Sequence, residues 1–132
     1  FDVLKKAELK RTKIFGHAEL SEVKIIELLY GSICYLQLSN FEGFGITVIE
    51  AMHLGTPVII NEIPSLIEIT NGSAICCKNK NIVLIAEEVN KLKNDKEYRD
   101  KIVNLGFNNA SKYTWDRFSE ILISLIKKTN SQ

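Results

Sequence analysis

The sequence predicts an α/β fold with a parallel sheet, and three observations support this prediction. Short apolar runs of strand length alternate along the chain with longer stretches of helical periodicity. The run 58–61, VIIN, is apolar up to its last residue, which is typical of a strand covered on both faces. The chain of 132 residues, with 45% hydrophobic and 25% charged residues, suits one globular domain with one core.

The first third of the chain is expected to alternate helix and strand. Residues 1–11 predict a short helix, and 13–18 predict a strand. Ser21 is a candidate N-cap for a following amphipathic helix, which Gly31 would end. Residues 33–38, ICYLQL, then predict a second strand.

A glycine-rich turn and a helix are expected between this second strand and the next one. The helix should begin near Gly45 and run to about Leu54. Gly55 suits the position just after the helix, and Pro57 prevents the helix from continuing. The strand 58–61 follows at once.

The remainder of the chain is predicted to be mostly helical. Residues 62–70, EIPSLIEIT, predict a loop with at most one helical turn, and 74–77 predict a short fourth strand. Asn81, Asp95 and Thr114 are candidate N-caps of three further helices, the second running toward Tyr113 and the last from Trp115 to about Lys128. The last helix has apolar residues at i, i+3, i+4, i+7 and i+8, namely Phe118, Ile121, Leu122, Leu125 and Ile126.

Charge and composition argue against several classes of protein. A formal net charge of +1 gives no electrostatic case for a nucleic-acid partner, and no apolar run approaches the roughly 20 residues that span a bilayer. The start of the chain lacks the order of a signal peptide and an initiator Met, so we expect it to lie inside a longer protein. Cys34, Cys76 and Cys77 form no metal-binding motif, and we expect reduced, buried thiols in a cytoplasmic protein.

The segment 41–52, FEGFGITVIEAM, is the strongest candidate for a binding site. It lies between a predicted strand and a predicted helix, where parallel sheets bind ligands and where the first helical amides attract anions. Gly43 and Gly45 would permit positive φ and remove Cβ atoms from the approach path. Glu42 and Glu50 would repel a phosphate but accept hydrogen bonds from sugar hydroxyls.

Two other interpretations of this segment stay open on pattern alone. It could be an ordinary tight turn into an ordinary helix, with Glu42 as a capping acid and Glu50 as a solvated residue. It could also begin a nicotinamide-binding G-x-G-x-x-G turn, with Glu62 on the ribose. Val48 occupies the position of the third glycine, which argues against the nicotinamide site.

A longer stretch, FEGFGITVIEAMHLGTPVIINEIPSLIEI, resembles the donor-binding region of retaining glycosyltransferases of family four, the group-one type with a GT-B fold. Glu42 and Glu50 match the two acids of its EX7E motif, and Ser39 matches a serine before the first acid. Glu68 falls in a similar segment, and YTWDRF resembles the start of the family's last helix. The other matching residues are Gly43, Phe44, Gly45, Ala51, Met52, Gly55, Pro57, Val58 and Ile59.

The resemblance implies a fold and a set of site residues. It implies a Rossmann-like parallel sheet with flanking helices, with 1–132 as a partial sugar-nucleotide (donor) binding domain and the N-terminal acceptor domain absent. Glu42 would be the catalytic residue, acting by positioning and electrostatics beside the transferred sugar, and Glu50 would hold the ribose. The implied substrate-binding residues are Gly43, Phe44, Gly45, Ile46, Thr47 and Glu50, with backbone amides around the turn holding the diphosphate.

The resemblance also implies a reaction. The enzyme would use a UDP- or GDP-sugar donor and no cofactor or metal. It would transfer the sugar, with retention, to a sugar, lipid or protein acceptor bound by the missing half. The expected location is the cytoplasm, where the full-length protein could contact the cytoplasmic face of the membrane. The alternatives are a non-catalytic nucleotide-sugar-binding module acting with a partner chain, and a nicotinamide-dependent oxidoreductase fragment.

Two departures from the family bear on activity. The Arg/Lys pair that the family places on the diphosphate is missing, and Arg11 and Lys13 do not lie in that motif. In the strand order 3-2-1-4-5-6, the strand 13–18 would also lack its usual neighbours. We therefore expect weakened donor binding and self-association of the isolated chain through open strand edges. We also expect it to be inactive, because nothing in it can seat an acceptor.

Overall fold

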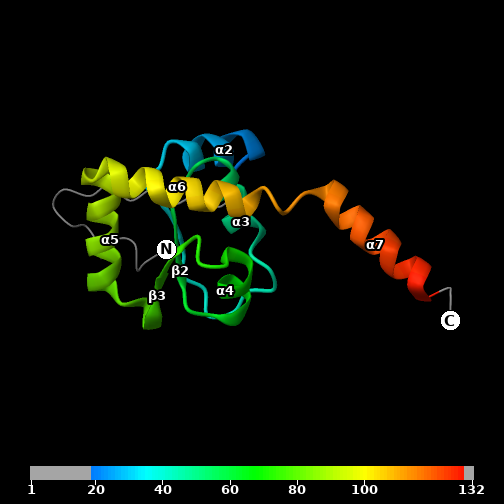
Figure 1. Ribbon diagram of the computed structural model, residues 1–132. Helices are drawn as coiled ribbons and strands as arrows, with labels where there is room; N and C mark the ends of the chain where they lie inside the picture. The colour runs from blue at the N-terminus through cyan, green and yellow to red at the C-terminus, as the bar shows by residue number, and fades with distance from the viewer. Residues whose placement is uncertain (1–18, 130–132) are drawn as a thin grey trace.

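The computed structural model describes residues 19–129, and the predicted elements at 1–11 and 13–18 lie outside this range. Three strands form a parallel sheet in the order β1-β2-β3: β1 (Tyr35–Gln37), β2 (Val58–Asn61) and β3 (Ile75–Cys77). Helices flank this sheet (Figure 1). The structure thereby confirms the predicted α/β class with a parallel sheet.

Six α-helices and one short 3-10 helix are described along with the strands. Three of them precede β3: α2 (Glu22–Tyr30), α3 (Ile46–His53) and α4 (Pro64–Thr70). The others follow β3: η1 (Lys78–Lys80), α5 (Ile82–Asn94), α6 (Lys96–Ala110) and α7 (Trp115–Thr129).

The two faces of the sheet bury different apolar clusters, because neighbouring residues of a strand point to opposite sides. Val58 and Ile60 of β2 lie in a cluster with residues of α3, α4 and the end of α2. Ile59 points to the other face, where it packs with Cys77 and Leu92. All of β2 is buried, which confirms the prediction of a strand covered on both sides.

The predicted helix ends are confirmed at the positions where a capping side chain or a glycine was expected. The Ser21, Asn81 and Asp95 side chains accept hydrogen bonds from amides of the helices that they precede. The Thr114 hydroxyl likewise accepts from Arg117 N at 3.2 Å. After α3, Gly55 has φ +72 and its amide donates to Met52 O, while Thr56 N donates to Ala51 O, the pattern of a Schellman C-terminus.

Three expectations need correction. The segment 62–70 contains a seven-residue helix, α4, rather than a loop, because Pro64 suits a first helical position and Leu66 and Ile69 gain burial against the core. The helix expected to run toward Tyr113 ends at Ala110. Of the cysteines, Cys77 is buried, but Cys34 is only half-buried and Cys76 is exposed.

Helix α7 extends away from the other elements (Figure 1). Its predicted apolar stripe is present, but Phe118, Ile121, Leu122, Leu125 and Ile126 are all exposed. Among residues 19–129, no helix is both long enough and apolar enough to cross a membrane.

Candidate functional site

The glycine turn before α3 is shaped by Gly45, the N-cap residue of that helix, which has φ +95. A Cβ atom at Gly45 would lie 2.8 Å from Leu66 Cδ2 and 2.9 Å from Ile69 Cδ1. Glycine is therefore suited to this position for two reasons: it adopts the left-handed conformation without strain, and its lack of a Cβ atom allows close packing on α4. Gly43 differs from the expectation, because its φ is not positive and a Cβ atom added to it would meet nothing within 4 Å.

The apolar side of α3 determines which residues of this helix face the solvent. Val48, Ile49, Ala51 and Met52 are buried, whereas Glu50 is exposed on the remaining face. Thr47 lies three residues before Glu50 and therefore on the same side of the helix. At the start of α3, Val48 N donates to Gly45 O at 3.0 Å, and Gly45 supplies no side-chain cap to the amides before it.

Glu42 is half-buried in the loop and is held by the end of β1. Its Oε2 atom accepts hydrogen bonds from Gln37 Nε2 at 2.8 Å and from Ser39 Oγ at 3.0 Å. The loop backbone is fixed as well, since Asn61 Nδ2 at the end of β2 donates to Ser39 O at 3.0 Å. Glu42 therefore has a defined orientation in this structure.

The phenol of Tyr35 is influenced by the charges of both acids. Burial raises the pKa of its phenol above the ordinary value, the Thr47 hydroxyl as hydrogen-bond partner lowers it, and the charges of Glu42 and Glu50 raise it. The phenol thus stays protonated and donates a hydrogen bond to Gln37 Oε1. The pKa of Tyr35 is thus sensitive to Glu42, Thr47 and Glu50, which the spacing of the sequence groups together.

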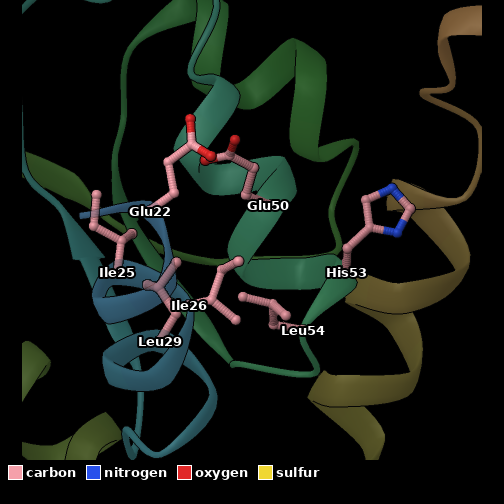
Figure 2. A pocket seen from close by; sticks show the side chains of 7 residues that line it. All are labelled: Glu22, Ile25, Ile26, Leu29, Glu50, His53 and Leu54. Atoms are coloured by element: carbon pink, nitrogen blue, oxygen red, sulfur yellow. The ribbon is translucent and has the colours of Figure 1, made fainter.

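A cavity of about 430 Å³ lies beside Glu50, between α2 and α3. Its lining residues are Glu22, Ile25, Ile26, Leu29, Glu50, His53 and Leu54. Figure 2 shows the carboxyl groups of Glu22 and Glu50 directed toward each other at one end, next to the apolar side chains. The His53 ring points away from them and packs edge-on against Phe107 at 6.3 Å between ring centroids, as expected for a packing residue.

Phe44 joins the turn to the end of α6. Its ring meets the Tyr113 ring edge-on, with 6.0 Å between the centroids. Tyr113 OH in turn donates to Ile69 O at 3.1 Å, and Asn109 Nδ2 donates to the same carbonyl at 2.7 Å. The segment that follows α6 thereby contacts the turn that precedes α3.

Some residues of the site are not marked by the sequence motifs. Tyr35 and Gln37 are predicted only as strand residues, although their alternation with Ser39 places all three on one face of the chain. Asn61, a polar residue at the end of an apolar strand, is another signal that could have indicated the site. Within residues 19–129, no three His, Cys, Asp or Glu side chains form a group that could hold a metal ion.

The arrangement suits a ligand that carries both anionic and hydroxyl groups. Helix amides without intrahelical partners favour an anion, while the Glu42 and Glu50 side chains can accept hydrogen bonds and would need donors. No residue in the described range 19–129 forms an ion pair with either acid. Glu62, the acid of the nicotinamide interpretation, instead lies 3.4 Å from the Lys78 ammonium.

Comparisons with known proteins place the chain in a family. Residues 2–109 match the family described as glycosyl transferases group 1. The chain is 34% identical over 94 residues to an uncharacterized glycosyltransferase of Methanocaldococcus jannaschii, covering 67% of this chain and 24% of that protein. It is 25% identical over 89 residues to O-antigen chain mannosyltransferase B of Escherichia coli, covering 67% and 23%. It is 32% identical over 130 residues to sucrose synthase 2 of Oryza sativa subsp. japonica, covering 86% and 16%.

The chain spans about a quarter or less of the length of these curated relatives. The family match itself extends over more than half of the chain and includes the whole segment from β1 to α3 that forms the site. The parallel α/β architecture agrees with it. The chain therefore belongs to the glycosyl transferases of group 1.

Proposed function

We propose that this chain is the donor-binding part of a retaining glycosyltransferase that uses a nucleotide-diphosphate sugar, of UDP or GDP type. The observation that carries the proposal is the placement of two acids around the turn into α3. Glu42 lies half-buried in the loop before the turn, and Glu50 lies on the exposed face of the helix at the edge of the cavity. A diphosphate needs the helix amides, and sugars need the carboxylates, so one donor molecule would satisfy both parts of the site.

In this proposal the two acids hold two different sugars. Glu50 accepts hydrogen bonds from the ribose hydroxyls, and its place at the edge of the 430 Å³ cavity leaves room for the nucleoside between α2 and α3. Glu42 accepts from hydroxyls of the transferred sugar. The amides of the turn from Gly43 to Thr47 hold the diphosphate, and no metal or cofactor is required.

The proposed reaction is a same-face displacement at the anomeric carbon. The bond from that carbon to the diphosphate oxygen breaks, and a bond to the acceptor oxygen forms on the same face. The acceptor proton passes to a phosphate oxygen of the leaving diphosphate. Glu42 positions the sugar and stabilises positive charge that develops on it.

We also propose that the acceptor, a sugar, lipid or protein, binds to a domain outside these residues. On this proposal the 132-residue chain alone does not turn over, and glycosyl transfer by the pure chain would contradict it. The exposed stripe of α7 further supports self-association of the isolated chain, and among residues 19–129 β1 is an outer strand of the sheet. The three free thiols support a reducing compartment, the cytoplasm.

The test is calorimetric titration of the full-length protein with UDP-glucose and GDP-mannose. We expect one of them to bind, and Glu50→Gln to weaken that binding about tenfold to a hundredfold, since hydrogen bonds to a charged acceptor are lost. Glu87→Gln, on the exposed side of α5, is the matched control and should leave the affinity unchanged. Equal affinity of Glu50→Gln and the parent protein would show that the ribose assignment is wrong.

A further inference from the structure

The strand β1 carries a polar ladder toward Glu42 that the proposed function does not use. Tyr35, Gln37 and Ser39 alternate along the chain and point to the same side. Tyr35 OH donates to Gln37 Oε1, and Gln37 Nε2 donates to Ser39 Oγ at 2.7 Å. The ladder ends on the Glu42 carboxylate.

Gln37 is the central member of this ladder because its side-chain amide makes hydrogen bonds both to Tyr35 and to Glu42. The carbonyl oxygen accepts from the Tyr35 phenol, which fixes the orientation of the amide, and the amino group then points to Glu42 Oε2 at 2.8 Å. Ser39 Oγ adds a second bond to the same oxygen at 3.0 Å. Within residues 19–129, the other oxygen of Glu42, Oε1, has no hydrogen-bond partner.

We infer that Gln37 is a positioning residue for the transferred sugar, acting through Glu42. This inference rests on the proposed function, in which Glu42 accepts hydrogen bonds from that sugar. Two donors hold Oε2, so the plane of the carboxylate is set and Oε1 is left to accept a sugar hydroxyl. An apolar side chain of similar length at Gln37 would remove a charge-assisted bond and leave Ser39 Oγ as the one remaining donor to Oε2 among residues 19–129.

A strand residue is well suited to this role. Gln37 pairs in register with Ile60 of the fully buried strand β2, so its backbone position is fixed by the sheet. Glu42 itself lies in a loop, whose conformation is less constrained than that of the sheet. Hydrogen bonds from a residue that is fixed in the sheet thus orient a carboxylate that lies outside the sheet.

The experiment compares UDP-glucose with UDP, and GDP-mannose with GDP, by calorimetry on the full-length protein. Gln37→Met keeps the length of the side chain and removes its hydrogen bonds. We expect affinity for the sugar nucleotide to fall about tenfold and affinity for the nucleotide alone to change less than about twofold. Leu36→Met, on the opposite face of β1, is the matched control and should change neither.

A double-mutant cycle with Glu42→Ala gives the second readout. In that background Gln37→Met should lower sugar-nucleotide affinity by less than about twofold, because the group that it positions is gone. Equal losses for sugar nucleotide and nucleotide, or full additivity with Glu42→Ala, would show a merely structural role and overturn the inference. Absence of binding by the parent protein would instead overturn the proposed function, and the inference with it.

Discussion

Gly45 offers a direct test of how the glycine turn is built. Replacing it with alanine introduces a Cβ atom at a residue with φ +95, a backbone conformation that L side chains rarely adopt. The same atom would meet two methyl groups at 2.8 and 2.9 Å, those of Leu66 and Ile69. Both are side-chain ends, but both residues are buried, so the methyl groups have little room to move away.

The expected cost combines these two effects. Placing alanine in a left-handed conformation costs about 1–2 kcal/mol, and overpacking a buried contact adds about 1 kcal/mol or more. The free energy of unfolding should therefore fall by about 2–3 kcal/mol, a large share of the stability of a small domain. Gly43→Ala should cost less than about 0.5 kcal/mol, because its φ is not positive and its Cβ would meet open space.

Urea unfolding followed by circular dichroism measures both variants against the parent chain. Gly45→Ala should lower the midpoint without changing the slope, since the surface exposed on unfolding is the same. Gly43→Ala should keep the midpoint but weaken donor binding in calorimetry, because its Cβ would stand in the approach to the proposed phosphate seat. An unchanged midpoint for Gly45→Ala would refute the reasoning that the turn depends on this glycine.

Four other predictions test separate parts of the structure. Ile26→Trp should fill the cavity between α2 and α3 and lower donor affinity in calorimetry with little change in melting temperature. Burial raises the pKa of Glu88, but hydrogen bonds from neighbouring side chains outweigh it and hold this pKa below its ordinary 4.5. Its contribution to stability is therefore present above pH 4.5 and lost as the pH falls through the lower folded value, and Glu88→Gln should flatten this part of the urea-midpoint profile. Asn109→Ala should cost about 1–3 kcal/mol in urea unfolding, whereas Tyr113→Phe should cost less than about 1 kcal/mol, since the Ile69 carbonyl keeps its bond from Asn109. The isolated chain should sediment as a concentration-dependent oligomer, and a clean monomer with a cooperative melt at high temperature would contradict this.

The order of the described elements followed from local signals in the sequence. Caps such as Asn81 and Asp95 bond to the amides that immediately follow them, so their effect needs no tertiary information. The buried strand 58–61 was equally clear, because a short apolar run of strand length, ended by Asn61, suits a strand covered on both faces. Helix α4 was missed because its stability comes from burying Leu66 and Ile69 under the glycine turn, a contact between segments distant in sequence.

The site was also predictable only as far as local sequence signals extend. The spacing of Glu42 and Glu50 around a glycine turn placed both near one helix end, and the structure has Glu42 in the loop before α3 and Glu50 on the exposed face of that helix. The supporting bonds from Gln37 and Asn61 depend on how the strand ends approach the loop, which sequence spacing does not give. The cavity beside Glu50 likewise depends on the packing of α2 against α3.

The two acids of the site are held in different ways, and the difference follows from where each lies in the fold. Glu42 lies in a loop but has one oxygen bound by two side chains of the β1 end. Glu50 lies on a helix, which fixes its Cα–Cβ direction but leaves the outer torsions of an exposed side chain free. The carboxylate proposed to lie beside the reacting sugar is thus the constrained one, and the carboxylate proposed to hold the ribose can adapt. A displacement reaction needs precise positioning of the groups next to the bonds that change. In the proposed function that group is Glu42, whose side chain is the one held by hydrogen bonds.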